Sequence, residues 1–342
     1  MTVTAQSRPA TGRGTLVLDV RDLSVRIRTE HGWTGIVDGV NLAVHAGETV
    51  GLVGESGSGK TVTSLAVMRL LPDNARISGA VRLGGRDITS LPERELDRVR
   101  GVEMAMIFQE PRRSLNPVFT VGEQVAESVR RHRGASRKEA WARAVELLDL
   151  VGIPDPGRRA HNHPHEFSGG MCQRVMLAMA LACDPKVLIA DEPTTALDVT
   201  VQRQVLSLIH DVQQQLGLGV LLITHDLGVV AEVCDRAAVM YAGRIVEEAP
   251  VTQLFDAPGH PYTAGLLHAM PDPVRHAERM AVIPGRVPPP HEFPEACHFA
   301  PRCPYAVEEC SQDVVPLRRT GPDHSVRCAR TEEIELGDAF YD

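Results

Sequence analysis

The chain has 342 residues, a net charge of −8 and an ordinary share of apolar residues with few aromatics. This composition predicts a globular protein with one large domain and an added module, or with two modest domains. The acidic balance and the lack of any basic run argue against nucleic acid as the main partner. No stretch approaches the roughly 18 apolar residues of a membrane span. Residues 1–14 are polar and small and lack the apolar segment of a secretory signal, so we expect a disordered leader.

Two runs near the start, residues 16–27 and 36–44, alternate apolar and polar side chains, and this spacing predicts β-strands. His31 and Trp33 lie between them. An exposed aromatic ring upstream of a phosphate-binding loop can stack on an adenine ring. We therefore consider Trp33 a candidate for adenine binding, with His31 as its rival and a purely structural tryptophan as the alternative.

The apolar run 49–53 leads into Gly-Glu-Ser-Gly-Ser-Gly-Lys-Thr at 54–61, and a helix-compatible segment, 62–71, follows. This strand–loop–helix setting is typical of a phosphate-binding loop. Glycines allow successive backbone N–H groups to point at an anion, and the helix start adds further donors. Lys60 would contact the β- and γ-phosphates, and the Thr61 hydroxyl would bind Mg²⁺. The expected nucleotide-binding residues are Gly54, Ser56, Gly57, Ser58, Gly59, Lys60 and Thr61.

The next segments predict a hairpin around Gly84-Gly85 (77–88), a short helix (92–100) and a buried strand that starts at residue 104. The strand ends near Gln109 and is followed by a proline. A glutamine at a strand end beside a nucleotide can coordinate Mg²⁺ or hold the attacking water, so Gln109 is a candidate for both roles.

Residues 121–151 have helical periodicity and predict a helical subdomain, at about 112–170, inserted into an α/β core. It ends in Phe-Ser-Gly-Gly-Met at 167–171, before an apolar helix. Ser168 can cap that helix, and Gly169 and Gly170 leave its first N–H groups open to an anion. The motif predicts a second phosphate site, with an ordinary capped helix as the alternative.

Another apolar strand, 186–190, ends in Asp191-Glu192, and a further one, 220–224, ends in His225. Phosphoryl transfer requires mainly positioning and charge stabilisation. Asp191 would hold Mg²⁺, Glu192 would polarise the water that attacks the γ-phosphate, and His225 would contact both. Residues 195–198, Thr-Ala-Leu-Asp, follow the acidic pair.

The last quarter contains a predicted hairpin (242–248), a short helix that ends at residue 270 and a proline-rich stiff spacer (284–294). Four cysteines follow, at Cys297, Cys303, Cys310 and Cys328. Two disulfides would need an oxidising compartment. A zinc site lacks its usual C-x₂₋₄-C spacing, whereas an iron–sulfur cluster fits four thiolates at wider spacing. Unligated thiols are a further alternative, and His298 and His324 are spare ligand candidates.

The order of these motifs resembles the Walker A, Q-loop, signature, Walker B, D-loop and H-loop of ABC-transporter ATPases, over about residues 16–258. The signature departs from the common L-S-G-G-Q at Phe167 and Met171. This variant, with I-F-Q-E-P at 107–111 and S-L-N-P at 114–117, is similar to the oligopeptide/dipeptide importer branch. The tail resembles the cysteine-bearing extension of that branch, in which some members carry a [4Fe–4S] cluster, and this makes the cluster the leading interpretation.

The resemblance implies an α/β P-loop ATPase core with a helical insert, an antiparallel β subdomain and a small Cys-rich extension. The expected boundaries are 15–258 for the ATPase domain and 259–342 for the extension. ATP and Mg²⁺ would lie between two ATPase subunits, with Ser168, Gly169 and Gly170 serving the partner's ATP and Asp198 at the interface. A heterodimer is favoured over a homodimer.

The resemblance also implies two transmembrane permease subunits and an extracytoplasmic substrate-binding protein as partners. The chain would bind the cytoplasmic face of the membrane and hydrolyse ATP to drive uptake of peptides or similar solutes. Two rival functions are a soluble ABC ATPase acting on DNA or ribosomes and an ATPase-inactive regulatory subunit. The acidic charge, the lack of a long coiled coil and the intact Lys60, Glu192 and His225 argue against them.

Overall fold

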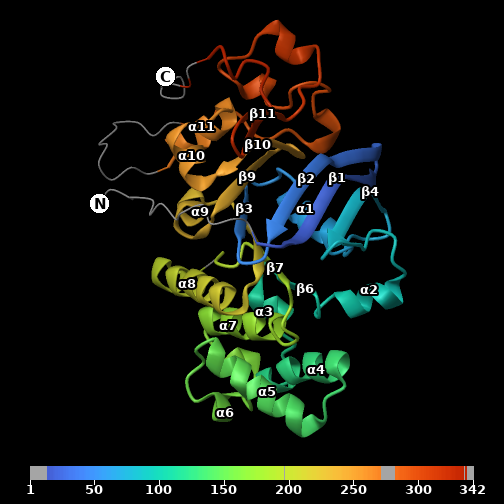
Figure 1. Ribbon diagram of the computed structural model, residues 1–342, viewed down its shortest axis with the longest axis vertical. Helices are drawn as coiled ribbons and strands as arrows, with labels where there is room; N and C mark the ends of the chain where they lie inside the picture. Colours follow the sequence, from blue (N-terminus) through green and yellow to red (C-terminus); the bar gives the residue numbers. More distant parts are fainter. Residues whose placement is uncertain (1–13, 196, 271–281, 335, 337–342) are drawn as a thin grey trace.

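Two β-sheets form the middle of the molecule, with a helical region at one end and the C-terminal residues at the other (Figure 1). The computed structural model describes residues 14–195, 197–270, 282–334 and 336. The expected leader, apart from Gly14, therefore lies outside the described residues, as do Ala196 of the Thr-Ala-Leu-Asp motif and the last six residues of the extension.

The larger sheet has the strand order β11-β12-β10-β9-β3-β8-β7-β6, and β9, β3, β8, β7 and β6 are parallel neighbours. Every residue of β3, β7 and β8 is buried, which explains why the sequence shows continuous apolar runs there. The strands are β3 (Thr49–Val53), β6 (Met104–Ile107), β7 (Val187–Asp191), β8 (Gly219–Thr224), β9 (Arg236–Tyr241), β10 (Arg244–Pro250), β11 (Arg318–Gly321) and β12 (His324–Val326).

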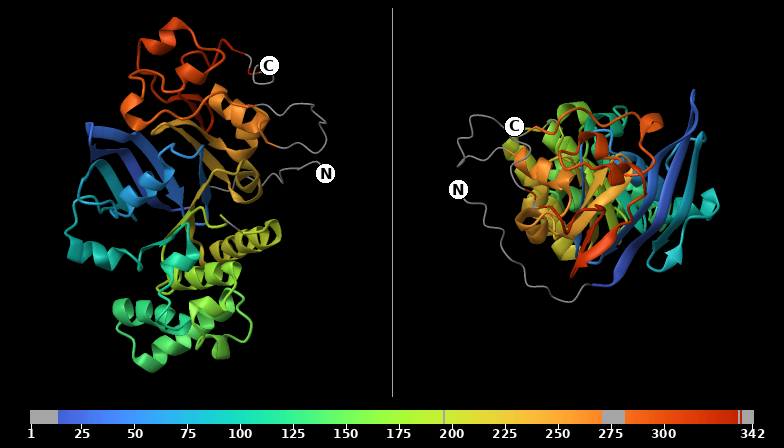
Figure 2. Two further views of the ribbon diagram at one scale, coloured as in Figure 1. Left: turned by 180° about the vertical axis from the view of Figure 1, so that it is seen from behind. Right: turned by 90° about the horizontal axis from the view of Figure 1, so that it is seen from above.

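The smaller sheet is antiparallel, in the order β2-β1-β4-β5, and lies to one side of the molecule (Figure 2). Its strands are β1 (Leu16–Thr29), β2 (Gly32–His45), β4 (Ala75–Leu83) and β5 (Arg86–Asp87). The predicted strands and the hairpin at Gly84-Gly85 are confirmed, although β1 and β2 run to the tip of their own hairpin. Apolar residues of this sheet, of the parallel strands and of α1 (Lys60–Val67) form one core.

The predicted helical insert is confirmed as a group of helices that packs on the end of the parallel sheet near β6 (Figures 1 and 2). Both long helices begin with a capping box, at Thr120 with Glu123 and at Ser136 with Glu139. The helices of this region are α3 (Pro111–Ser114), α4 (Val121–Arg133), α5 (Arg137–Leu150), α6 (Pro156–Arg159), the 3₁₀ helix η1 (Pro164–Glu166) and α7 (Gly169–Ala180). The helix α2 (Glu93–Val99) lies outside this region, and its Leu96 and Val99 belong to the core shared by the smaller sheet and α1.

The C-terminal residues are joined to the larger sheet, because β12 pairs with β10 through Glu247 and Val326. The sequence pattern does not indicate the β11–β12 hairpin, whose strands are short and mostly polar. The proline-rich segment lies along β2, where the His291 and His31 rings stack with centroids 4.3 Å apart. The remaining helices are α8 (Val199–Leu216), α9 (Leu227–Val233), α10 (Val251–Asp256), α11 (Pro261–His268), η2 (Pro290–Glu292), η3 (Ala300–Arg302) and η4 (Glu308–Ser311).

Candidate nucleotide site and cysteine pocket

The loop between β3 and α1 is shaped by its glycines. A Cβ on Gly54 would lie 2.1 Å from the Met240 carbonyl oxygen, so no larger residue fits there. Gly59 caps α1 with φ of 103°, a conformation that favours glycine. Lys60 is buried, and its Nζ donates to the carbonyl oxygens of Gly54 (2.7 Å) and Glu55 (2.9 Å). Burial lowers the pKa of this ammonium. The loop therefore holds a desolvated cation beneath a cradle of backbone donors.

Asp191, the last residue of β7, lies beside the start of α1, and the Thr61 hydroxyl donates to its carboxylate at 3.3 Å. Burial raises the pKa of Asp191 to about 6, against the lowering effect of Thr61. A hydroxyl next to a buried carboxylate is a donor set that suits Mg²⁺, which prefers oxygen ligands. The structure thus brings together Thr61 and Asp191, two of the three residues that the sequence analysis assigns to the metal, while the third, Gln109, donates to Glu192.

Glu192 is held by side chains from several elements. Its carboxylate accepts hydrogen bonds from Gln109 Nε2 (2.9 Å) and Thr195 Oγ1 (2.8 Å), and His225 Nδ1 lies 3.3 Å away. Its backbone has a positive φ of 45°, which is rare outside glycine. Burial raises the pKa of Glu192, but the hydrogen bonds from Thr195 and His225 outweigh burial and lower it. An ionised carboxylate is therefore fixed at the edge of the sheet.

This arrangement follows from the topology. Because β6, β7 and β8 are parallel neighbours, the residues that follow their carboxyl ends meet at one edge. The sequence analysis names Gln109, Glu192 and His225 but gives no role to Thr195. The hydroxyl three residues beyond a strand-end glutamate is the signal that would have identified it.

The second glycine motif starts α7, and the Ser168 hydroxyl accepts from the Met171 N–H at 3.3 Å, as expected for a helix cap. Ser168 is exposed. Gly170 is required by packing, because a Cβ there would lie 2.4 Å from a methyl group of Val201 on α8. Asp198 caps α8 by accepting from the N–H groups of Thr200 and Val201. Both motifs thus expose a polar helix start.

The candidate adenine residues lie at the tip of the β1–β2 hairpin. Trp33 is half-buried, and the Arg76 guanidinium covers one face of its ring at 4.1 Å. His31 is exposed and stacks on His291. Each ring has one face already in contact with a neighbour, so a base would have to stack on the other face.

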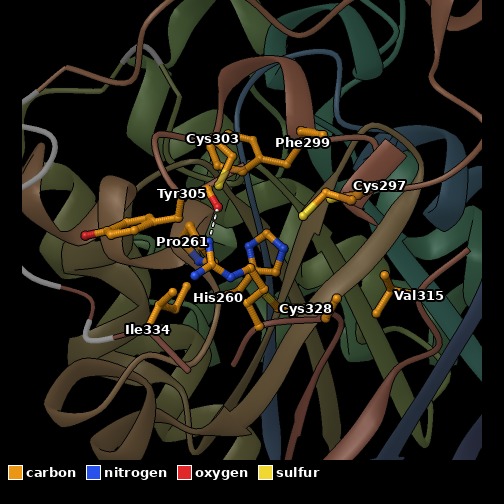
Figure 3. A pocket seen from close by; sticks show the side chains of 13 residues that line it. His260, Pro261, Cys297, Phe299, Cys303, Tyr305, Val315, Cys328 and Ile334 are labelled. Carbon is orange, nitrogen blue, oxygen red and sulfur yellow. Dashed lines mark hydrogen bonds between the residues drawn. The ribbon is translucent and has the colours of Figure 1, made fainter. Parts of the chain in front are cut away.

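All the cysteines of the tail line one small cavity (Figure 3). Burial, together with the neighbouring thiols, raises the pKa of Cys303 to about 12 and that of Cys328 to about 11. All seven cysteines are free thiols. In the described ranges no three His, Cys, Asp or Glu side chains are close enough to hold a single metal ion. Thiols around a cavity fit the ligand type of an iron–sulfur cluster, but they do not converge on one ion.

Neither of the spare ligand candidates, His298 and His324, lines this cavity. His298 Nδ1 lies 2.6 Å from the Ala242 carbonyl oxygen, and His324 Nε2 lies 2.8 Å from the Glu247 carboxylate. The histidine in the cavity wall is His260, whose pKa burial lowers to about 4. The sequence analysis gives His260 no role, because its distance from the cysteines in sequence hides the contact.

Comparisons with known proteins agree with this geometry. A family model described as "ABC transporter" matches residues 37–195, and a second, "Oligopeptide/dipeptide transporter, C-terminal region", matches residues 246–310. A Brucella melitensis protein named as a peptide import ATP-binding protein is 50% identical over 93% of this chain and 98% of its own length. A "Probable peptide ABC transporter ATP-binding protein" of Sinorhizobium fredii is 51% identical over 96% and 98%.

Among solved structures, a dimeric ATP-binding cassette in a post-hydrolysis state bound to ADP and Pi superposes with a TM-score of 0.61 at 28% identity, over 68% of this chain and 98% of that one. The protein cbiO1 of Clostridium perfringens, part of the ABC transporter complex cbiONQ, gives a TM-score of 0.60 at 26% identity, over 71% of this chain and 92% of that one. No helix in the described part of the chain is long and apolar enough to cross a membrane. The chain belongs to the ATP-binding proteins of ABC transporters, in the group that carries the oligopeptide/dipeptide transporter C-terminal region.

Proposed function

We propose that this chain is the ATP-hydrolysing subunit of an importer that takes up peptides or similar small solutes. The observation that carries the proposal is Glu192, an ionised carboxylate held by Gln109, Thr195 and His225 at the same sheet edge as the phosphate-binding loop. The names of the relatives from Brucella and Sinorhizobium support peptides as the cargo.

Each site residue has a role in this proposal. The backbone of the loop from Gly54 to Thr61 and the Lys60 ammonium bind the phosphates. Thr61, Asp191 and Gln109 hold Mg²⁺, and Glu192 accepts a proton from the attacking water while His225 contacts the γ-phosphate. The signature residues Ser168, Gly169 and Gly170 bind the partner's ATP, and Trp33 or His31 stacks on adenine.

The partners follow from the shared site. A second ATPase subunit, favoured to be a different chain, completes each nucleotide site, and two permease subunits form the transport path. An extracytoplasmic binding protein delivers the solute, and this chain lies peripherally on the cytoplasmic face of the membrane. In this proposal residues 15–258 are the ATPase domain and 259–342 the extension.

We also propose that the four cysteines hold a [4Fe–4S] cluster, with zinc as the alternative. A cluster supplies several metal positions to which thiolates around a cavity can bind, and it would link the loops that carry these thiolates. Its expected role is structural or regulatory. Protein purified without oxygen should contain iron and acid-labile sulfide and absorb visible light. A colourless protein with stoichiometric zinc would refute the cluster.

The function is tested by purifying the chain with its native partners. We expect hydrophobic permease subunits and a second ATPase subunit to co-purify, and we expect peptide-loaded binding protein to stimulate ATP hydrolysis in vesicles. Co-purification with ribosomes or DNA in place of permeases would support the soluble rival. Turnover that survives Lys60→Ala in this chain would indicate that the partner subunit alone hydrolyses ATP.

A further inference from the structure

Residue 55 is a variable position of the phosphate-binding loop, yet here both its side chain and its backbone contact the C-terminal extension. The Arg302 guanidinium binds the Glu55 carboxylate with two nitrogens, at 2.7 and 3.1 Å. The Arg302 side chain is 5% exposed, and that of Glu55 is 31% exposed. A two-nitrogen contact with a desolvated arginine is geometrically specific, unlike most surface ion pairs.

Arg302 is itself fixed in place. Its Nε donates to the Pro284 carbonyl oxygen at 2.7 Å, and its guanidinium lies over the rings of Tyr241 (5.6 Å) and Phe299 (6.0 Å). These contacts hold the Arg302 side chain in one orientation, with its guanidinium directed at the loop.

The backbone of Glu55 is held as well. Its N–H donates to the Tyr262 hydroxyl at 2.8 Å, and its carbonyl oxygen accepts from Lys60 Nζ at 2.9 Å. Tyr262 is fully buried on α11. The extension therefore contacts the same loop residue twice, through Tyr262 and Arg302, and that residue also contacts the lysine that binds phosphate.

The negative charge of Glu55 bears on the binding of a triphosphate. A triphosphate bound by the loop places several negative charges near the Glu55 carboxylate, and two like charges in partly buried surroundings repel strongly. Arg302 neutralises this carboxylate and keeps it turned toward the extension. We propose that Arg302 is a positioning residue for ATP, which acts from the C-terminal extension by neutralising Glu55 and fixing the start of the phosphate-binding loop.

The inference rests on the proposed function, since it assumes that the loop binds ATP. It also gives the cysteine pocket a route to that site. Arg302 directly precedes Cys303, and Phe299, which lines the pocket, lies beneath the guanidinium. A single short 3₁₀ helix, η3, therefore connects the pocket wall to the arginine that binds the loop.

The test measures binding of the fluorescent analogue mant-ATP with Mg²⁺ to the full chain, and the KM for ATP in the assembled complex. Arg302→Gln should weaken mant-ATP binding about tenfold, the order expected for one uncompensated charge. The KM should rise by a similar factor, while kcat stays near that of the wild type. Adding Glu55→Gln to Arg302→Gln should restore most of the affinity, because the repelling carboxylate is then absent.

Two further variants keep the test decisive. Glu55→Gln alone should bind at least as tightly as the wild type, and this holds even if Arg302→Gln does not fold. The control is Arg319→Gln, at an arginine of the extension whose side chain is 72% exposed, and it should bind as the wild type does. The inference is overturned if Arg302→Gln binds normally, or if Glu55→Gln weakens binding. A wild-type chain that binds no mant-ATP would instead refute the proposed function.

Discussion

The sheet edge at Glu192 and the cysteine pocket of the extension hold their reactive groups in different ways. At the edge, side chains that follow parallel strands reach hydrogen-bond partners, and these partners lower the pKa of Glu192 so that it is ionised. In the pocket, thiols on irregular loops are surrounded by apolar residues and by one another, and burial raises the pKa of Cys297 and Cys303.

The difference shows what each region needs in order to act. The edge carries its charge already, fixed by hydrogen bonds from Thr195 and His225, and it needs only Mg²⁺ and nucleotide. The pocket holds neutral thiols at physiological pH, so binding of a metal group must release protons and is expected to weaken in acid. The edge is preorganised by the sheet, whereas the pocket depends on what it binds.

Replacement of Glu192 by glutamine is expected to give the largest effect, because it removes the charge at the preorganised edge. In the assembled complex Glu192→Gln should lower kcat by at least about 100-fold. Binding of mant-ATP should persist, since the glutamine keeps a similar shape beside Gln109 and Thr195. The measurement is the rate of phosphate release under saturating ATP.

Glu95→Gln is the matched control, because Glu95 is an exposed glutamate of α2 that pairs with Arg86. It should leave turnover unchanged. If Glu192→Gln hydrolysed ATP at the normal rate, the assignment of Glu192 as the proton acceptor would be wrong.

The two regions also differ in how well the sequence predicts them, because one is built on regular strands and the other on irregular loops. The edge was predictable because each parallel strand is a continuous apolar run that ends in a polar residue, and parallel neighbours bring such ends together. This pattern predicts that Gln109, Asp191 and His225 lie at one edge of the sheet. Thr195 was not predicted, because its contact with Glu192 depends on the turn after β7.

The extension was much less predictable. The spacing of its cysteines shows how many thiols it has but not that all of them line one cavity with His260, which comes from the start of α11. The Arg302–Glu55 pair joins positions far apart in the sequence, of which Glu55 is a variable position of the phosphate-binding loop and Arg302 belongs to no motif. Irregular loops have no periodicity, so only the packed chain reveals these contacts.

The second-largest effect is expected in the pocket. Cys303→Ser should abolish stable retention of iron and sulfide and lower the unfolding temperature, because one ligand of four is lost. The kcat for ATP should stay near the wild-type value, since Cys303 has no contact with the carboxylates of the edge. Iron and sulfide content and thermal unfolding are the measurements.

Cys183→Ser is the control, because Cys183 is buried in the helical region and a serine hydroxyl can still donate to the Ser128 carbonyl oxygen. It should retain iron and stability. Equal metal content in both variants would show that the pocket does not hold the metal group.

A third prediction uses the opposite effects of pH on the two regions. The pKa of His260 is lowered to about 4 by burial, so the unfolded state takes up a proton below about 6.5 that the folded state takes up only near 4. The stability contributed by neutral His260 is therefore lost as pH falls through this window. Asp191, with its pKa raised to about 6, acts in the opposite direction, because the folded state then binds the proton first.

The two contributions are separated by comparing variants. Between pH 7 and pH 5, the free energy of unfolding of the wild type should fall by about 2 kcal/mol more than that of His260→Gln. Asp191→Asn should shift the balance the other way, with a steeper loss in acid than the wild type. Urea titrations at the two pH values measure both. Parallel curves for wild type and His260→Gln would contradict the buried neutral histidine.

The smallest expected effect tests whether the edge is tuned by single hydrogen bonds. Thr195→Val keeps the shape of the side chain but removes the donor that lies 2.8 Å from the Glu192 carboxylate. A hydrogen bond to a charged group contributes about 1.5–3 kcal/mol, and part of it persists as a contact with water, so kcat should fall only about fivefold. The pKa of Glu192 should rise, which moves the acid limb of the pH–rate profile to higher pH. Thr195→Ser restores the donor and should restore both. A fall in kcat without a shift of the acid limb would mean that Thr195 acts on the backbone turn and not on the carboxylate.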